Sequence, residues 1–203
     1  LSNNIDAAVE QGIIFENHGA DILDVGGQST RPGHTPIAQD EELQRVIPVI
    51  KELASRVKIP ISIDTFFSRV ADQAVAMGAS IINDQWALNG DAEMASLASQ
   101  LEVPIVLMHN QNNTDYQDLI PDIRNNLERC VSKAKSHGIP IEHIIVDPGL
   151  GFGKTTQHNL TVVQQLSALK GIAPAILVGP SRKSMIGRTL DLPIDERIEG
   201  TAA

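Results

Sequence analysis

The chain has 203 residues, of which 42% are hydrophobic, enough for one domain with a sizeable core. Aromatic residues make up only 3%, so that core must be largely aliphatic, as in the layered interior of an α/β protein. The net charge of −9 argues against nucleic acid or an anionic membrane as a general partner.

Cysteine content and terminal sequence bear on the compartment. Cys130 is the one cysteine, so an internal disulfide is excluded and a reducing, cytoplasmic location is expected, with Cys130 packed rather than reactive. No apolar run approaches the ~20 residues that a membrane-spanning helix needs. Residues 1–6 lack the basic start and apolar centre of a signal peptide. Because the chain does not begin with Met, we expect the natural N-terminus to lie upstream.

Helical and strand patterns alternate along the chain. Apolar spacing predicts helices over residues 2–18, 37–56, 68–77, 91–100, 116–137 and 157–169, and one that opens at Ser181. Short apolar runs that stop at polar or glycine residues predict strands over residues 20–26, 60–64, 80–84, 104–109, 143–147 and 175–179. Pro48 lies inside the second helix, where a kink or a restart is expected.

This alternation predicts a parallel sheet built from βαβ units. A doubly wound sheet gathers its ligand contacts at one switch point. A (β/α)₈ barrel gathers them from every strand, at its C-terminal face. Because all six strands here end in polar or glycine residues, we predict an α/β fold of the (β/α)₈ TIM-barrel type, as a single domain over residues 1–203. Such a barrel has eight strands and six are predicted here, so we expect strands to be missing at one or both ends of the chain.

The segment Asp147-Pro-Gly-Leu-Gly-Phe-Gly-Lys154 is the most informative one. An apolar strand stops on a carboxylate, and the glycines that follow let backbone approach a ligand. Its spacing resembles a phosphate-binding loop, but Pro148 stands where that pattern requires glycine. Proline has no N–H with which to bind phosphate, so a nucleoside triphosphate is not expected.

Four polar residues stand at strand ends: Asp64, Asn83, Asp84 and Asp147. Any one of them could be a helix N-cap, and for Asp84 a structural role is as reasonable as a functional one. Together they can bond the N–H and amino groups of a flat heterocycle and favour developing positive charge. His109 has no second histidine at ligand spacing, so a protein-only zinc site is not expected.

Two basic segments complete the candidate site. Ser181-Arg-Lys-Ser184 follows the last strand, where Lys183 and the N-terminus of a helix would attract an anion or a carbonyl group. Thr30-Arg31-Pro32-Gly33 places a guanidinium group on a loop, for which a solvated arginine is the alternative interpretation.

Five segments together resemble the dihydropteroate synthase family of pterin-binding barrels. They occur in that family's order and span nearly the whole chain: Asp24-Val-Gly-Gly-Gln-Ser-Thr-Arg-Pro-Gly33, Ile63-Asp-Thr65, Ile82-Asn-Asp84, Asp147-Pro-Gly-Leu-Gly-Phe-Gly-Lys154 and Gly179-Pro-Ser-Arg-Lys-Ser-Met-Ile-Gly187. Gln28 stands where the family usually has Glu, and Gln85 is a less usual sequel to Asn83-Asp84.

The resemblance implies condensation of 6-hydroxymethyl-7,8-dihydropterin diphosphate with 4-aminobenzoate, with Mg²⁺ as cofactor and a homodimer as the assembly. By this mapping the chain lacks the first and last strands, and it contains no metal ligand because the family's Mg²⁺-binding Asn belongs to the first strand. The implied catalytic residues are Asp64, Asp147, Lys183 and Arg31. The implied substrate-binding residues are Thr30, Arg31, Pro32, Asp64, Asn83, Met108, Asp147, Phe152, Gly179, Lys183 and Ser184.

Within this set the resemblance implies distinct roles. The pterin ring would be held by Asp64, Asn83, Asp147 and Lys183. Thr30 and Arg31 would close over the diphosphate and the aminobenzoate, Pro32 and Phe152 would line the aminobenzoate pocket, and Ser184 would take its carboxylate.

Two other functions remain open on the sequence. A folate-dependent methyltransferase that serves a corrinoid protein is also a pterin-binding barrel, but it needs no diphosphate site, so Arg31 and the segment around Lys183 count against it. The second alternative is a pterin-binding module without catalytic activity, which would bind the pterin ring but would not convert it to product.

Overall fold

A computed structural model of the chain describes residues 4–28 and 37–203. The predictions for Thr30, Arg31 and Pro32 therefore fall outside the described residues. Across those two ranges, no helix combines the length and the apolar character needed to cross a membrane.

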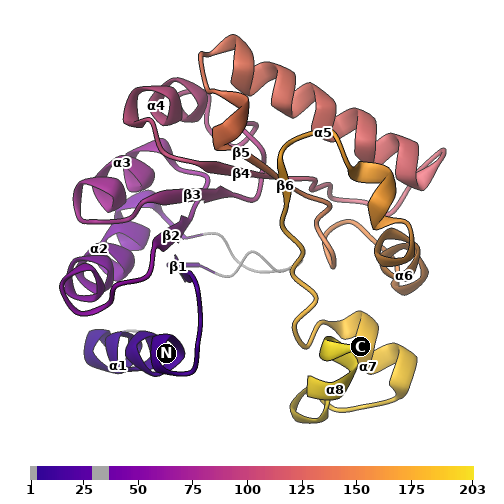
Figure 1. Cartoon of the computed structure of the whole chain (residues 1–203), viewed down its shortest axis with the longest axis horizontal. Coiled ribbons are helices and arrows are strands. Elements are labelled where there is room, and N and C mark those ends of the chain that lie inside the picture. The colour runs from indigo at the N-terminus through magenta and orange to yellow at the C-terminus, as the bar shows by residue number, and fades with distance from the viewer. Residues whose placement is uncertain (1–3, 29–36) are drawn as a thin grey trace.

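Six short strands and eight α-helices make up the described fold (Figure 1). The strands are β1 (Leu23–Gly26), β2 (Ile61–Asp64), β3 (Ile81–Asp84), β4 (Ile105–Met108), β5 (Ile144–Asp147) and β6 (Ala175–Ile176). The α-helices are α1 (Ile5–Asn17), α2 (Gln39–Arg56), α3 (Ser68–Ala76), α4 (Met94–Leu101), α5 (Leu119–Ser136), α6 (Thr156–Gln164), α7 (Ser184–Leu190) and α8 (Ile198–Ala202). The 3₁₀ turns are η1 (Ile141–His143), η2 (Leu166–Leu169) and η3 (Ile194–Glu196).

The strands form one parallel sheet whose spatial order, β1 to β6, is the order of the chain. A doubly wound sheet would reverse direction at a switch point, whereas a barrel adds each strand beside the previous one. Figure 1 shows helices α1 to α6 in an arc around one side of this sheet. The predicted α/β fold with a parallel sheet is confirmed, and the strand order is that of a (β/α)₈ barrel.

The core between the sheet and the helices is aliphatic, as its composition predicts. Ile63, Ile82 and Leu107 on the strands are fully buried, and so are Ile50 on α2 and Leu127 on α5. All four residues of β4 are buried, which is typical of a strand covered on both faces. Burial of each such side chain contributes about 1.5–3 kcal/mol to folding.

Cys130 belongs to this core. It lies on the buried face of α5, where burial raises the pKa of its thiol. The interpretation of Cys130 as a packed residue is confirmed.

Of the two outcomes expected at Pro48, a kink or a restart of the helix, the restart is wrong. Helix α2 runs without a break from Gln39 to Arg56, with Pro48 inside it. Buried Val46 and Ile50 lie on either side of the proline and belong to the same core. Their packing keeps the helix continuous although proline removes one backbone hydrogen bond.

The helix predicted to open at Ser181 begins three residues later, at Ser184. Arg182 adopts a positive φ of 50°, which a helix cannot include. Tertiary contacts hold it there, because its N–H donates to Thr201 Oγ1 at 3.0 Å and its carbonyl accepts from Arg197 Nη1 at 3.1 Å. Lys183 is consequently the N-cap residue of α7, and Ser184, the first residue of the helix, is exposed.

Candidate active site

The register of the sheet brings the polar strand ends to one edge. Gly26 on β1 pairs with Asp64 on β2, and Asp64 pairs with Asn83 on β3. Further along the same edge, Met108 on β4 pairs with Asp147 on β5. Because the strands are parallel, all of these residues lie at the C-terminal side of the sheet, where open α/β sheets and barrels bind ligands.

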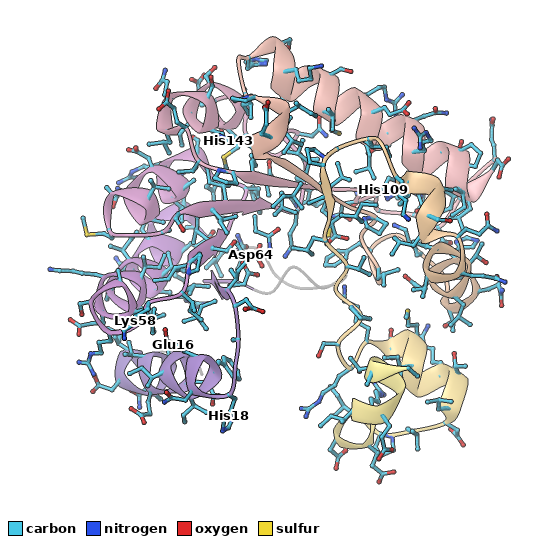
Figure 2. The ribbon with its side chains drawn as sticks, viewed as in Figure 1. Glu16, His18, Lys58, Asp64, His109 and His143 are labelled. Carbon is cyan, nitrogen blue, oxygen red and sulfur yellow. The ribbon has the colours of Figure 1, made fainter. Side chains whose placement is uncertain are left out.

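Two amides and two carboxylates form a first group, which we call the β1–β3 cluster: Asp24, Asp64, Asn83 and Gln85. Asn83 Nδ2 donates to Asp24 Oδ2 at 3.1 Å, and Gln85 Nε2 donates to Asp64 Oδ2 at 2.7 Å. Asp64 lies near the centre of the molecule in Figure 2. Within the described part of the chain, Asp64 Oδ1 and Gln85 Oε1 are buried without a hydrogen-bond partner.

The β1–β3 cluster favours a ligand that brings N–H donors. Burial raises the pKa of Asp64 well above its usual range, and the negative charges of Asp24, Glu42 and Asp84 raise it further. The bond from Gln85 opposes this increase. Partial loss of hydration also raises the pKa of Asp24, although this residue is exposed, and hydrogen bonds from Ser62 and Asn83 oppose the increase. A donor that bonds these carboxylates would stabilise their ionised form, since a hydrogen bond to the charged form favours it.

Glu42 is a neighbour that the sequence did not reveal. It lies in the first turn of α2 and is 0% exposed, and Gln28 Nε2 donates to its Oε2 at 2.8 Å. Burial raises the pKa of Glu42. Acidic residues at a helix start are normally solvated, so nothing in the sequence pattern marked this one. Gln28 fits the contact because a glutamate there would set two buried carboxylates against each other.

A second group, the β5 cluster, consists of Asp147, Phe152, Gly179, Lys183 and Met108. Asp147 Oδ1 accepts from the Gly149 N–H at 2.7 Å. Lys183 Nζ donates to the Leu150 carbonyl and lies 4.8 Å from the centroid of the Phe152 ring. Met108 is buried beside Asp147, and a Cβ added at Gly179 would lie 3.8 Å from Lys183 Nζ.

Burial raises the pKa of Asp147 to about 6, opposed first by the Gly149 bond and then by the charges of Lys183 and Lys154. Asp147 is therefore largely ionised at neutral pH. An anionic acceptor, a cationic donor and an aromatic ring thus meet at the end of β5.

The glycine loop, residues 149–153, gives this cluster its shape. Gly149, Gly151 and Gly153 have φ angles of 69°, 83° and 55°, which favour glycine. A side chain at Gly149 would overlap the His109 carbonyl oxygen, and one at Gly151 would lie 3.3 Å from Lys183 Cδ. The loop can approach Lys183 this closely only because it carries no side chain at that point.

Asp84 has the contacts of a structural residue. It is 1% exposed, and its carboxylate accepts from the N–H groups of Trp86 at 2.9 Å and Leu88 at 2.6 Å. The loop that it closes contains Ala87 and Leu88 at φ angles of 48° and 68°. Burial raises the pKa of Asp84 to about 6. Its two oxygens are committed to backbone donors rather than to a ligand.

The structure thus brings most of the predicted site residues to the C-terminal edge of the sheet, in two groups, one on β1 to β3 and the other at the ends of β4 and β5 and in the segments that follow β5 and β6. Asp64 and Asn83 join the β1–β3 cluster, and Met108, Asp147, Phe152, Gly179 and Lys183 form the β5 cluster. Ser184 is exposed and adjoins Lys183 at the start of α7. Asp24, Glu42 and Gln85 are the neighbours that the sequence analysis did not assign to the site.

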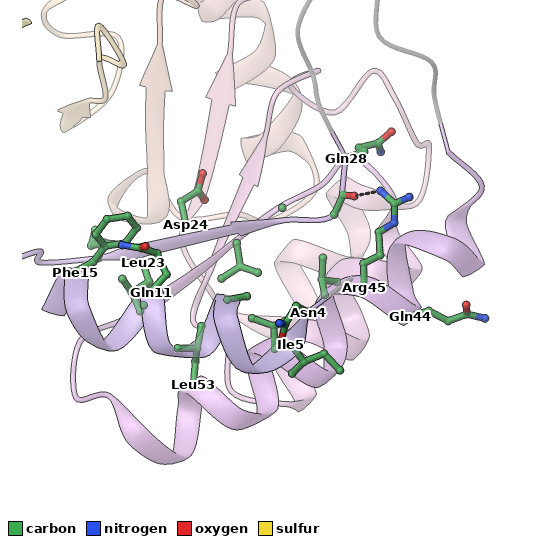
Figure 3. A pocket seen from close by; sticks show the side chains of 18 of the residues that line it. Asn4, Ile5, Gln11, Phe15, Leu23, Asp24, Gln28, Gln44, Arg45 and Leu53 are labelled. Carbon is green, nitrogen blue, oxygen red and sulfur yellow. Dashed lines mark hydrogen bonds between the residues drawn. The ribbon is translucent and has the colours of Figure 1, made fainter. Parts of the chain in front are cut away.

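A groove of about 1370 Å³ opens elsewhere, between α1, β1 and α2 (Figure 3). Phe15, Leu23 and Leu53 give it a largely apolar wall. It reaches the polar edge of the sheet at Asp24 and Gln28, and neither Asp147 nor Lys183 lines it. A largely apolar groove leaves the polar groups of a heterocycle without hydrogen-bond partners, which is unfavourable. We therefore place the candidate site at the strand ends and not in this groove.

The described residues offer no evident metal site. Among residues 4–28 and 37–203, no group of three or more His, Cys, Asp or Glu side chains is arranged to hold a metal ion. The carboxylates of the β1–β3 cluster are instead bonded to side-chain amides.

Comparisons with known proteins show the family of the chain. A family model described as "Pterin binding enzyme" matches residues 1–203. The dihydropteroate synthase of Clostridium beijerinckii is 49% identical over 201 residues, which cover 99% of this chain and 75% of that protein.

Two solved structures are similar throughout. The dihydropteroate synthase of Clostridium difficile, solved in the presence of pteroic acid, superposes with a TM-score of 0.95 at 43% identity, covering 99% of this chain and 77% of that one. The enzyme of Xanthomonas albilineans, solved with 4-aminobenzoic acid, superposes with a TM-score of 0.94 at 38% identity, covering 97% and 72%. With this identity over nearly its whole length, the chain belongs to the dihydropteroate synthase family of pterin-binding enzymes.

Proposed function

We propose that the protein condenses 6-hydroxymethyl-7,8-dihydropterin diphosphate with 4-aminobenzoate to give 7,8-dihydropteroate and diphosphate. The observation that carries the proposal is the β5 cluster, where ionised Asp147, Lys183 and the Phe152 ring converge at one strand end. Relatives of this family have been solved with pteroic acid and with 4-aminobenzoic acid, which are a pterin–aminobenzoate conjugate and one substrate of this reaction.

The pterin ring would lie across the strand ends between the two clusters. Asp147 accepts hydrogen bonds, and so can Oδ1 of Asp64, which has no partner among the described residues; the ring would present N–H and amino groups to both. Asn83 can both donate and accept, and Lys183 donates to a ring carbonyl or ring nitrogen. Met108, buried beside Asp147, forms part of the apolar wall.

The aminobenzoate would lie beside the glycine loop. Phe152 offers an aromatic surface, and Gly179 leaves room for backbone approach next to Lys183. The exposed hydroxyl of Ser184 would donate to the aminobenzoate carboxylate. The proposal also assigns Thr30, Arg31 and Pro32 to this pocket, because they match the family's Ser-Thr-Arg-Pro-Gly motif.

In the reaction, the aminobenzoate nitrogen bonds to the pterin methylene carbon as the bond from that carbon to the diphosphate oxygen breaks. The electron pair leaves with diphosphate, and the amine releases one proton. Positive character develops on the pterin during this step, and the carboxylates of Asp64 and Asp147 stabilise it because the protein holds them in place beforehand. Arg31 would contact the departing negative charge.

Mg²⁺ belongs to the proposal because it neutralises diphosphate as a leaving group. The described residues present no ligand cluster for it, so no step is assigned to it here. The proposal also includes a cytoplasmic location, which the buried thiol of the lone Cys130 supports. A homodimer is part of the proposal too, and light scattering of the purified protein tests it.

The experiment supplies the purified protein with the pterin diphosphate, radiolabelled 4-aminobenzoate and Mg²⁺, and follows label in dihydropteroate. Turnover that requires both substrates supports the proposal. Calorimetric titration with 6-hydroxymethyl-7,8-dihydropterin runs in parallel. Pterin binding without turnover would favour the inactive binding module, and absence of pterin binding by folded protein would overturn the proposed site altogether.

A further inference from the structure

Lys154 is a buried lysine that lies beneath the glycine loop and is only 9% exposed. Its Nζ is 2.9 Å from His109 Nδ1, 3.0 Å from the Phe152 carbonyl oxygen and 3.1 Å from the Gly149 carbonyl oxygen. An ammonium group has three N–H donors, and these three acceptors account for all of them. Lys154 therefore has no donor left for a phosphate group.

A charged lysine and a neutral histidine together satisfy these contacts. Burial lowers the pKa of Lys154 to about 7, while Asp147 raises it and Lys183 lowers it. With His109 Nδ1 as an acceptor, all three contacts take an N–H of Lys154, which is the arrangement of the ammonium form. Burial, and then the Lys154 charge, lower the pKa of His109 to about 3. His109 Nδ1 is thus free to accept, and the ring proton lies on Nε2.

The same three contacts join the glycine loop to the end of β4. Gly149 and Phe152 lie at either end of the loop, and His109 follows β4 directly. The His109 N–H also donates to the Asp147 carbonyl at 2.8 Å, so β4, β5 and the loop meet at this point. Figure 2 shows where His109 lies along the row of strand ends.

The loop in turn holds residues of the proposed pterin site. Its Gly149 N–H bonds the Asp147 carboxylate, its Leu150 carbonyl accepts from Lys183, and it carries the Phe152 ring. A shift of the loop would therefore displace an acceptor, a donor and an aromatic wall together. Displacements of this kind are costly, since substrate-binding groups act only within a narrow range of positions.

We propose that Lys154 is a positioning residue of the pterin site, which fixes the glycine loop against β4 and places a positive charge behind Asp147 without touching substrate. The inference rests on the proposed function. Its electrostatic part involves the groups that face Asp147, which are Lys183, Lys154 and the Gly149 N–H. Of the two lysines, Lys154 is the one whose three N–H groups all bond the loop and His109.

The test compares Lys154→Met, which keeps the length of the side chain, with Lys170→Met, which changes an exposed lysine after η2. Calorimetry measures Kd for 6-hydroxymethyl-7,8-dihydropterin from about pH 5 to about pH 9. In Lys154→Met we expect Kd to rise by about tenfold at neutral pH, because a buried site loses hydrogen bonds to a charged group. The acid midpoint of binding should also move to higher pH, because Asp147 loses a neighbouring positive charge. Lys170→Met should match the wild type in both.

A merely structural lysine would lower the folded fraction and leave the midpoint of the folded protein in place, so wild-type Kd and midpoint in folded Lys154→Met would overturn the inference. Failure of the wild type to bind pterin would instead overturn the proposed function. If Lys154→Met does not fold, His109→Leu replaces it as the test, because this variant removes one acceptor of Lys154 and keeps the lysine charge. We then expect weaker pterin binding with an unchanged acid midpoint, and an unchanged Kd would contradict the inference.

Discussion

The side-chain amide of Gln85 donates to Oδ2 of Asp64 at 2.7 Å, from the end of β3 to the end of β2. This bond occupies one carboxylate oxygen and, within the described residues, leaves Oδ1 buried without a partner. A buried acceptor without a hydrogen bond destabilises the protein, and a ligand that supplies an N–H donor would remove this penalty. Gln85 thereby orients Asp64 for the proposed pterin site.

The variant Gln85→Leu should weaken pterin binding, and more so at acid pH. Without the amide donor, the already raised pKa of Asp64 moves further up, so less of the carboxylate is ionised at neutral pH. We expect Kd for 6-hydroxymethyl-7,8-dihydropterin to rise by about tenfold at neutral pH and to recover as the pH increases. Calorimetry over a pH series measures this. The same loss of affinity at every pH would contradict the electrostatic role.

Asp147→Asn tests the acceptor at the end of β5. The change replaces an anionic acceptor by a neutral amide that also donates, while the Asn carbonyl can still accept from Gly149. Losing a charge-assisted pair with the pterin costs on the order of 2–4 kcal/mol, so its affinity should fall by tenfold or much more. Unchanged affinity by calorimetry would remove Asp147 from the site.

The stability of the same variant should depend on pH in a defined direction. Because the pKa of Asp147 is about 6 in the folded protein and 3.8 as its ordinary value, the folded state binds more protons between these values. The wild type therefore loses stability as the pH rises from about 4 to about 6, by at most about 3 kcal/mol from this group. Asp147→Asn does not titrate there, so its unfolding free energy should improve relative to wild type over this window, as urea denaturation measures.

Asp91→Asn is the control of opposite sign. The carboxylate of Asp91 accepts from the Ser68 N–H at 2.8 Å, and bonds of this kind lower its pKa despite partial burial. Its contribution to stability is present above the ordinary pKa and is lost as the pH falls through the lowered one. The unfolding free energy of the variant should therefore fall relative to that of the wild type as the pH rises to about 4. Parallel pH trends for Asp91→Asn and Asp147→Asn would contradict both assignments.

The strand ends could be predicted because their signal is local. All six strands lie inside the ranges predicted from apolar runs, since buried parallel strands consist mainly of apolar residues. Asp64 and Asp147 are the last residues of their strands and Asn83 is the last but one, and their convergence needs only the assumption that parallel strands end at one edge. Helix starts were less accurate, because the positive φ at Arg182 depends on contacts with Arg197 and Thr201.

The supporting contacts could not be predicted because they join distant parts of the chain. Gln85 and Asp64 are 21 residues apart, and Lys154 and His109 are 45 apart. From sequence, a lysine after several glycines is expected to be solvated or to bind phosphate. Lys154 is buried because the glycine loop packs on β4, which the sequence does not show. Glu42 was missed for the same reason, because its burial depends on Gln28 beyond the end of β1.

Lys183→Ala should separate binding from stability. Lys183 is half-buried and precedes α7, where it contacts the Leu150 carbonyl and the Phe152 ring. A cation–π contact of this kind contributes about 0.5–2 kcal/mol, so Tm should fall by only a few degrees. Affinity for the pterin diphosphate should fall by about tenfold or more, because a charged donor is lost. A collapse of the thermal melt with normal affinity of the folded fraction would make Lys183 structural.

The neighbours Asn83 and Asp84 should behave in opposite ways, although both end β3. Asp84 is buried and holds the N–H groups of Trp86 and Leu88, so Asp84→Ala leaves two buried donors unpaired and should cost about 2–5 kcal/mol of unfolding free energy. Asn83 is only half-buried and bonds Asp24 through its amide, so Asn83→Ala should cost about 1 kcal/mol or less. For pterin affinity we expect the reverse order, because Asn83 belongs to the proposed pterin site and the oxygens of Asp84 bond backbone N–H groups. Urea denaturation and calorimetry on the two variants give both quantities. Equal losses of affinity in Asn83→Ala and in folded Asp84→Ala would mean that the loop after β3, rather than Asn83 itself, determines pterin binding.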